Sequence, residues 1–188
     1  MEIEIRAFVE DFSLIQLKLA EIGTTLLANN HIIDLWFCES RYTKFEEVQQ
    51  DKPGSYALRI RQCDDSKSHK VELNCKVLEL EGDHNAFHEY ETIVGDLGQT
   101  RKILEALGFK VFCTIDKMRK TYKFGNCTIN LEDIKGYRPA VELEIIDDKD
   151  IENNKLKLHK LMGQLNILEA NKIEKSITYL FMKEFSFK

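Results

Sequence analysis

The stretch Glu2-Ile3-Glu4-Ile5-Arg6 alternates strictly between charged and apolar side chains. Alternation with a period of two predicts a β-strand, because successive side chains of a strand point to opposite faces of a sheet. Ile3 and Ile5 would lie on one face, and Glu2, Glu4 and Arg6 on the other. The alternation continues through residues 2–9, so we expect the chain to open with a strand that has one charged face.

Pairs of charges separated by two or four positions return in later segments of the chain. The charged pairs are Arg59 and Arg61, Glu72 and Lys76, Glu89 and Glu91, Lys117 and Arg119, and Glu142 and Glu144. For any single strand, a half-exposed sheet with its charges in solvent explains the pattern equally well. For the whole set, a second arrangement is favoured, because the helices expected between the strands carry apolar stripes that need a surface to cover. With helices on the apolar faces, the charged faces would be directed toward one another.

We therefore predict an α+β fold, a closed antiparallel β-barrel of about eight strands with helices packed on the outside. The expected strands cover residues 2–9, 24–38, 56–62 and 70–78, a segment around 89–91, and a last segment near 173–185; the expected helices cover 11–23, 96–108 and about 150–162. The order strand, helix, strand occurs twice, which indicates two similar halves of one fold. Because no linker rich in Pro or Ser separates the halves, we expect a single domain over 1–188, with the main motifs in 2–145 and a C-terminal helix and closing strand in 147–188.

The composition narrows the classes of partner. The chain has 188 residues and a net charge of −5, with 43% hydrophobic and 31% charged residues, so nothing indicates a nucleic-acid or membrane partner. No run approaches the roughly 20 apolar residues of a membrane helix, and the first residues lack the order of a signal peptide. Five scattered cysteines without a C-x-x-C pair are typical of free thiols. We expect a cytoplasmic protein.

A barrel interior that holds both signs of charge has a chemical consequence. Moving such charges into a dry interior costs several kcal/mol per ion, so the interior would be wet and suited to a highly charged ligand. Lys and Arg side chains bind phosphate oxygens, and carboxylates bind Mg²⁺ or Mn²⁺. The two sets of side chains together favour a ligand made of phosphates and a divalent metal.

The ordered series of motifs resembles the CYTH superfamily, also called triphosphate tunnel metalloenzymes, which includes class IV adenylyl cyclases, thiamine triphosphatases and inorganic tripolyphosphatases. The motifs that carry the resemblance are Glu2-x-Glu4-x-Arg6, Asp34-Leu35-Trp36-Phe37, Ala57-Leu58-Arg59-Ile60-Arg61, Lys76, Glu89-x-Glu91, Lys117-x-Arg119 and Val141-Glu142-Leu143-Glu144. They span about residues 1–145, and Lys175–Tyr179 resembles more loosely the closing strand of the class IV cyclases. The sequence departs from the family at Arg6, where the signature has Lys, and at Val77-Leu78, where Gly-Pro is frequent.

The resemblance implies a role for each charged set. Triphosphate binding would fall to Arg59, Arg61, Lys76, Lys117 and Arg119; metal binding to Glu2, Glu4, Glu142 and Glu144; and catalytic roles to Arg6 and to Glu132 or Asp133. The implied ligand is a small triphosphate such as ATP, thiamine triphosphate or tripolyphosphate, with Mg²⁺ or Mn²⁺ as cofactor and a monomer or homodimer as the assembly.

Three functions stay open from the sequence. The first is an enzyme resembling class IV adenylyl cyclase, in which the ribose 3′-hydroxyl of ATP attacks the α-phosphorus and pyrophosphate leaves. The second is a triphosphate phosphohydrolase, in which water attacks the terminal phosphorus. The third is a binding module for a polyphosphate or nucleotide without turnover. A plain structural barrel with its charges in solvent is the alternative without any ligand.

Overall fold

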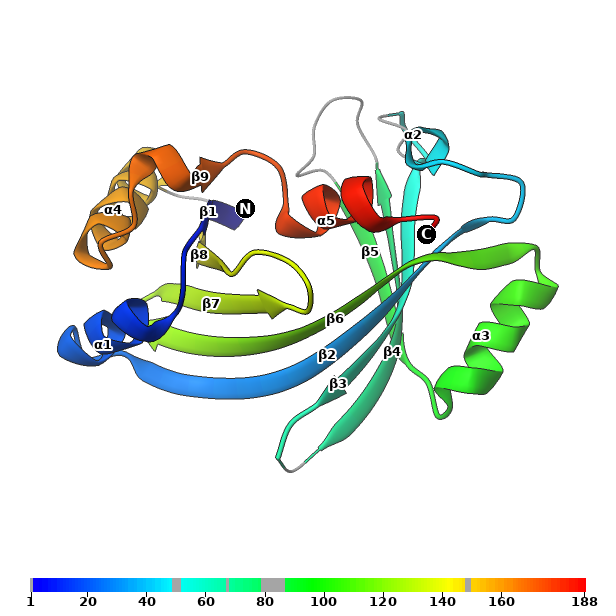
Figure 1. Cartoon of the computed structure of the whole chain (residues 1–188), viewed down its shortest axis with the longest axis horizontal. Helices are drawn as coiled ribbons and strands as arrows, with labels where there is room; N and C mark the ends of the chain where they lie inside the picture. Colours follow the sequence, from blue (N-terminus) through cyan, green and yellow to red (C-terminus); the bar gives the residue numbers. More distant parts are fainter. Residues whose placement is uncertain (1, 49–51, 67, 79–86, 148–149) are drawn as a thin grey trace. The chain divides into compact units, whose positions relative to one another are not determined.

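The structure is a computed structural model that describes the chain except for residues 1, 49–51, 67, 79–86 and 148–149 (Figure 1). Nine strands and five α-helices form an α+β fold within this described part. The strands are β1 (Glu2–Phe8), β2 (Thr25–Glu39), β3 (Tyr56–Asp64), β4 (His69–Leu78), β5 (Phe87–Ile93), β6 (Phe109–Phe124), β7 (Cys127–Ile134), β8 (Ala140–Ile146) and β9 (Lys172–Ile173). The helices are α1 (Ser13–Glu21), α2 (Phe45–Val48), α3 (Leu97–Ala106), α4 (Ile151–Gln164) and α5 (Ile177–Phe185).

The strands form one hydrogen-bonded sheet in the order β5-β4-β3-β2-β6-β7-β8-β1-β9. The described pairings of β1 with β8 and β9, of β2 with β3, of β4 with β3 and β5, and of β7 with β6 and β8 are all antiparallel. The chain divides into two compact units. Unit 1 consists of Met1–Asn30 and Lys117–Ile177, and unit 2 of His31–Asp116 and Thr178–Lys188. The single domain over 1–188 stays a prediction.

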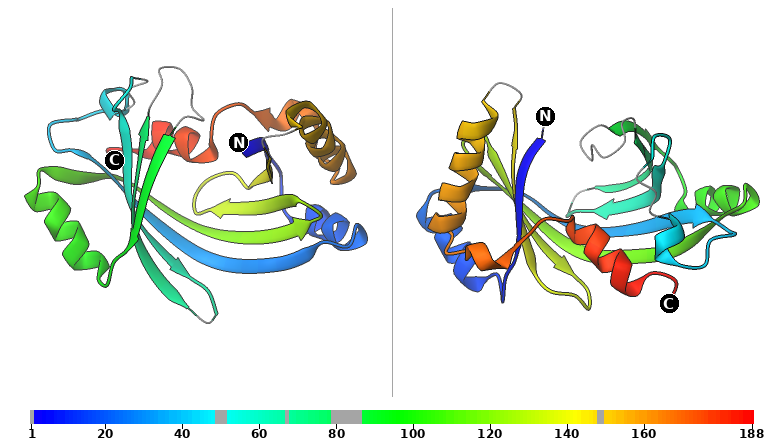
Figure 2. Two further views of the ribbon diagram at one scale, coloured as in Figure 1. Left: turned by 180° about the vertical axis from the view of Figure 1, so that it is seen from behind. Right: turned by 90° about the horizontal axis from the view of Figure 1, so that it is seen from above.

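The core of unit 1 lies between its strands and the helices α1 and α4. The strands contribute their apolar face, which includes Ile3, Ile5, Ile129, Leu143 and Ile145, and the helices contribute Ile15, Leu19, Leu158, Leu161 and Met162. In both views of Figure 2, α4 lies against the strands of this unit. The prediction that helices cover the apolar faces is therefore confirmed for unit 1.

Unit 2 has a separate core on the apolar face of β2, β3 and β4. Leu35, Phe37, Leu58 and Ile60 pack there with Leu104 of α3. The helix begins as the sequence predicts, because the Asp96 carboxylate accepts a hydrogen bond of 2.6 Å from the backbone N–H of Gln99 and so caps the first turn.

The predicted closing strand near 173–185 was wrong. Only Lys172–Ile173 forms a strand, β9, while Ile177–Phe185 forms helix α5. The buried side chains of this segment are Ile177, Phe181 and Met182, which recur at a helical spacing. An aromatic contact also links α5 to α2, since the rings of Tyr179 and Phe45 lie 5.3 Å apart. Ile177, Tyr179 and Phe181 are apolar at every second position, so the pattern fitted a strand as well as a helix.

The predicted closed barrel is not confirmed either. Within the described residues, no pairing joins β5 and β9, the strands at the two ends of the sheet. The C-terminal segment, which was expected to supply the closing strand, pairs with Arg6 and Ala7 of β1 and then forms α5. The described sheet is thus antiparallel but open.

Two further predictions can be compared with the structure. All five cysteines are described, and all are free thiols, as expected. Among the described residues, none of the helices combines the length and apolar character that crossing a bilayer requires.

Candidate functional site

One face of unit 1 collects the charged residues of four strands. The register places Glu4 opposite Glu144 and Arg6 opposite Glu142 across β1 and β8. Directly opposite residues of antiparallel strands point to the same face. The same relation extends the face across β7 and β6. The charged face of unit 1 is formed by Glu4, Arg6, Lys117, Arg119, Asn130, Glu132, Glu142 and Glu144. Glu2 belongs to β1, but its side chain lies outside the described residues.

Arg6 joins two carboxylates of this face. Its Nε donates to Glu142 Oε2 at 3.0 Å, and its Nη2 donates to Glu4. Asn130 Nδ2 lies 3.5 Å from the other oxygen of Glu142 and so helps to orient that carboxylate. Because Arg6 is only 17% exposed, solvent screens its two contacts incompletely. The family signature has Lys at this position, but a guanidinium can bind two carboxylates at once through its planar fork.

Glu132 is the most deeply buried acid of the face. Its side chain is 3% exposed, and its Oε2 lies 2.9 Å from the Nζ of Lys117, which is itself 4% exposed. Arg119 contacts the other oxygen. Burial raises the pKa of the Glu132 carboxyl, but the charges and hydrogen bonds of Lys117 and Arg119 more than offset burial, so the pKa lies below its ordinary value. Glu132 is therefore ionised at neutral pH and fixes two cations side by side.

The structure separates the two acids that the sequence left open. Glu132 pairs with Arg119 across β6 and β7, whereas Asp133 pairs with Met118. Neighbouring residues of a strand point to opposite faces, so Asp133 lies on the other face, where it is exposed. The structure brings Glu132 together with the other predicted residues and does not bring Asp133 to them.

Unit 2 has a charged face of its own. Arg61 of β3 binds Asp34 of β2 through two parallel hydrogen bonds, Nε to Oδ1 at 2.6 Å and Nη2 to Oδ2 at 2.7 Å. Asp34 is 1% exposed and Arg61 18%. Such a bidentate pair fixes the plane of the guanidinium. The charged face of unit 2 is formed by Asp34, Trp36, Arg59, Arg61, Glu72, Asn74, Lys76, Glu89 and Glu91.

The remaining basic residues of this face have different surroundings. The guanidinium of Arg59 lies 5.2 Å from the ring centroid of Trp36, directly opposite on β2, which is a cation–π contact. Lys76 Nζ lies 3.2 Å from Glu89, and this pair is about 40% exposed. Arg59 is thus supported by an aromatic ring, and Lys76 by an acid close to solvent.

Sequence reasoning assigned no role to three polar residues on the two faces. Asp34, Asn74 and Asn130 are all buried, and each holds a charged neighbour in place. Asn74 donates to Glu89 at 2.5 Å and to Glu91 at 3.2 Å. The signal was available, because Asn74 and Asn130 lie two positions from charged residues of the same strand. We followed only charges along the alternation and so passed over amides.

The donor chemistry of unit 1 fits a divalent cation of the Mg²⁺ type. Glu4 and Glu144 face each other across two strands, with Glu142 beside them, and carboxylate oxygens are the ligands these cations prefer. Within the described residues, no three His, Cys, Asp or Glu side chains are already grouped around a common point. Mg²⁺ is usually held by one or two carboxylates together with substrate phosphates. The arrangement therefore suits a metal that binds with its phosphate ligand better than a closed protein cage.

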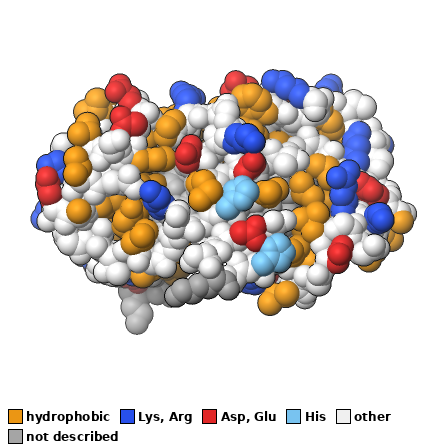
Figure 3. Space-filling model, turned by 60° about the horizontal axis from the view of Figure 1, so that its bottom comes forward, with side chains coloured by type: hydrophobic (Ala, Val, Ile, Leu, Met, Phe, Trp, Pro, Cys, Tyr) orange, Lys and Arg blue, Asp and Glu red, His pale blue; other side chains and the backbone are white. Residues whose placement is uncertain are grey.

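Two histidines, His31 and His69, lie on the other face of the unit 2 strands, away from its charged face. His31 Nε2 is 2.6 Å from Asp116, and His69 Nδ1 is 2.5 Å from Asp64. Asp64 is directly opposite both His31 and His69 in the register, and Figure 3 shows acidic and histidine side chains alternating along this face. Each histidine is paired with an aspartate, and neither lies on the charged face of unit 2.

A comparison with known families decides the identity of this charged fold. The family described as the CYTH domain matches residues 1–177. The chain belongs to the CYTH domain family.

Individual relatives agree with this assignment. A protein of Methanocaldococcus jannaschii, provisionally named an adenylate cyclase, is 26% identical over 183 residues, which cover 94% of this chain and 95% of that protein. The structure of the PH1819 protein from Pyrococcus horikoshii is similar with a TM-score of 0.75 at 22% identity, covering 98% of this chain and all of that one.

A third relative comes from Hippeastrum. This provisionally named adenylyl cyclase, whose structure is described as revealing a dominant triphosphatase activity, has a TM-score of 0.64 at 18% identity. The match covers 97% of this chain and 95% of that one. At such identities the two structural likenesses show the shared fold.

Proposed function

We propose that this CYTH protein is a metal-dependent enzyme that processes a small triphosphate, with ATP cyclisation to cyclic AMP and pyrophosphate as its first candidate reaction. The observation that carries the proposal is the charged face of unit 1. There, Lys117 and Arg119 contact one buried carboxylate, that of Glu132 on β7. The facing carboxylates of Glu144 and Glu4 lie on β8 and β1, the next two strands of the sheet. Cations for phosphate and acids for metal thus share one surface.

Phosphate binding is assigned to the five basic residues of the two faces, Arg59, Arg61, Lys76, Lys117 and Arg119. A lysine ammonium has three N–H donors and a guanidinium five, so Lys117 and Arg119 keep donors for phosphate while they contact Glu132. Their positions are set before the ligand arrives, which lowers the entropic cost of binding. Charge-assisted hydrogen bonds to phosphate are stronger than hydrogen bonds between neutral groups.

Metal binding is assigned to the carboxylates of β1 and β8. Glu4 and Glu144 would supply the first ligands, with Glu142 and Glu2 as further candidates. A bound Mg²⁺ or Mn²⁺ supplies charge neutralisation and polarises phosphoryl oxygens. Arg6 contacts one oxygen of Glu4 and one of Glu142, so its charge offsets part of the repulsion between these carboxylates and phosphate.

The protein's own part in catalysis is positioning. Glu132 has a lowered pKa and two cationic partners, which makes it a poor proton acceptor. Its role would be to hold Lys117 and Arg119 in position. Arg6 orients two carboxylates in the same way. Asp133 lies on the opposite face and is left out of the proposed site. Phosphoryl transfer needs chiefly alignment and charge neutralisation, which such residues provide.

The triphosphate tunnel that gives the family its other name stays part of the proposal, together with a cytoplasmic location. Hydrolysis of the triphosphate is the second candidate reaction, and the Hippeastrum neighbour with its reported triphosphatase activity favours it. Both reactions need the same binding of the phosphates and the metal. Cyclisation additionally needs the ribose 3′-hydroxyl aligned with the α-phosphorus.

The test is turnover of a panel of ATP, GTP, thiamine triphosphate and tripolyphosphate with Mg²⁺ or Mn²⁺, with cyclic nucleotide resolved from released phosphate. We expect metal-dependent turnover of at least one triphosphate, and loss of that turnover in Lys117→Ala. The matched control is Lys120→Ala, which removes a lysine from the same strand but from the opposite face. Tight metal-dependent binding without turnover across the panel would establish a binding module instead.

A further inference from the structure

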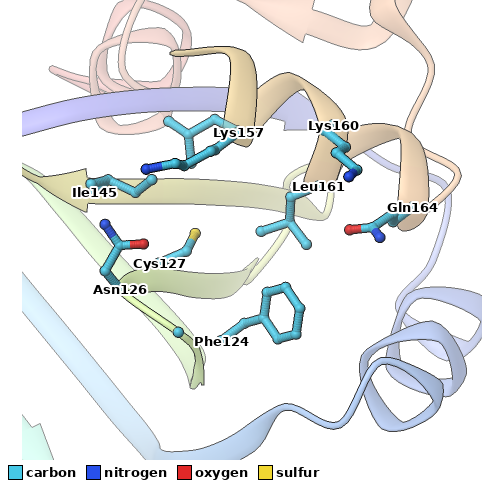
Figure 4. A pocket seen from close by; sticks show the side chains of 10 residues that line it. Phe124, Asn126, Cys127, Ile145, Lys157, Lys160, Leu161 and Gln164 are labelled. Atoms are coloured by element: carbon cyan, nitrogen blue, oxygen red, sulfur yellow. The ribbon is translucent and has the colours of Figure 1, made fainter. Parts of the chain in front are cut away.

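Unit 1 has a pocket on the side of the sheet away from the charged face. It has a volume of about 390 Å³ and lies between the β6–β7 hairpin, β8 and α4. Cys127 and Ile145, which line it, are directly opposite each other in the register and face away from Glu144. In Figure 4, Phe124 and Cys127 point into the pocket from the hairpin, and Leu161 points into it from the helix. The pocket is therefore distinct from the proposed triphosphate site.

The inner wall of this pocket is apolar. Cys127, Ile145, Leu158 and Leu161 line it and are all buried. Burial raises the pKa of the Cys127 thiol to about 11, so the thiol is neutral at physiological pH and acts as a small apolar group. The volume of the pocket lies in the range of small-molecule sites.

The rim of the pocket is cationic. Lys157 and Lys160 line it from α4, while the ten lining residues include no Asp or Glu. Lys157 Nζ donates to Asn154 at 3.0 Å, a neutral partner. In the part of the chain that the structure describes, no acid forms an ion pair with either lysine. Gln164 and Asn126 add neutral polar groups at the rim.

We propose that this pocket is a binding site for a small amphipathic anion, with an apolar body against the inner wall and one anionic head group at Lys157 and Lys160. An apolar wall with a few polar groups at the mouth is the usual composition of a small-molecule site. The two ammonium groups select an anion over a neutral or cationic molecule of the same shape. The site is independent of the proposed function, because it uses none of the residues assigned to triphosphate or metal.

The experiment uses the full chain and the fluorescent probe 8-anilinonaphthalene-1-sulfonate, with octanoate as an unlabelled competitor. We expect saturable binding of one probe per chain, and displacement by octanoate. The variant Lys157→Gln/Lys160→Gln should weaken probe binding by roughly 2–30-fold, from the loss of two contacts near solvent. Gln164→Trp, a change at an exposed rim position, should block the site without disturbing the buried wall.

The matched control is Lys155→Gln/Lys172→Gln, which removes the same charge from exposed positions of unit 1 outside the pocket. Unchanged binding in this control, with weakened binding in the other two variants, supports the site. Absence of saturable binding, or equal weakening in the control, overturns it. Displacement by octan-1-ol as effective as displacement by octanoate would overturn the assignment of an anionic ligand.

Discussion

The two units hold their basic residues in different ways. In unit 1, Lys117 and Arg119 share one carboxylate, Glu132, which is 3% exposed. In unit 2, Arg61 binds Asp34 through a bidentate contact, Arg59 lies against the ring of Trp36, and Lys76 pairs with Glu89 close to solvent. The charge of Glu89 also interacts with that of Arg59.

This difference has consequences for stability and for ligand binding. Removal of Glu132 takes a buried partner from two cations at once, whereas removal of Asp34 takes a partner from Arg61. We therefore expect the free energy of unfolding to depend strongly on Glu132 in unit 1. Single substitutions on the charged face of unit 2 should cause smaller losses. The predictions below test this contrast.

The largest effect is expected for Glu132→Ala. Breaking a buried ion pair by removing one partner costs about 3–5 kcal/mol, because the remaining charge stays desolvated. Asp34→Ala should destabilise less, since Arg61 is 18% exposed and Lys117 only 4%. Urea unfolding measures both. Equal losses of free energy in the two variants would remove the distinction between a shared and a separate partner.

The next effect concerns metal. Glu144→Gln removes one of two facing carboxylates and keeps the size of the side chain, so we expect the Mg²⁺ concentration for half-maximal activity to rise about tenfold or more. Arg61→Lys should instead raise the KM for the triphosphate, because an ammonium cannot replace the bidentate contact to Asp34. Steady-state kinetics at varied Mg²⁺ separate the two. Identical profiles would contradict the division between acids and bases.

A smaller effect is expected on the pH dependence of stability. The pKa of Glu132 in the folded protein lies below its ordinary value of 4.5, so its contribution to stability is complete above that pH and is lost as the pH falls through the folded pKa. The stability difference between the wild type and Glu132→Gln should therefore shrink on acidification below about pH 4.5. Chemical unfolding between pH 3 and 7 measures this difference. A difference that grows toward low pH would reverse the assigned sign.

The smallest effect is expected for Lys76→Ala. Its pair with Glu89 is about 40% exposed, and exposed pairs contribute about 0–1 kcal/mol. Thermal unfolding should change little, while the affinity for tripolyphosphate falls. A loss of stability comparable to that of Asp34→Ala would show that Lys76 has a structural role that its exposure does not indicate.

Much of the fold could be predicted from periodicity. The alternation at Glu2–Arg6 and the helical stripe with Leu19 correspond to β1 and α1, because each pattern has only one secondary structure that buries its apolar residues. The C-terminal segment failed for the opposite reason. Ile177, Phe181 and Met182 are buried in a helix, but Ile177, Tyr179 and Phe181 are apolar at every second position, so a period of two fitted as well.

The sequence predicted which residue types form the site better than it predicted which of these residues contact one another. Alternation placed Glu142 and Glu144 on one face, as the structure does. It gave no choice between Glu132 and Asp133, because adjacent residues always take opposite faces and only the pairing with β6 decides which of them meets Arg119. Long-range register of this kind depends on packing of the whole sheet, which no local pattern contains.

The central claim is that acids and bases of the charged faces bind a metal and a triphosphate together. Its most direct test is the melting temperature of the protein with tripolyphosphate and Mg²⁺, against the same concentrations of monophosphate and Mg²⁺. A ligand at a hundredfold excess over its Kd adds about 2.7 kcal/mol, or roughly 5–10 °C for a chain of this size. We predict such a rise with tripolyphosphate and Mg²⁺, and a clearly smaller one with monophosphate or without the metal. Equal shifts for triphosphate and monophosphate, or no shift with either, would contradict the account.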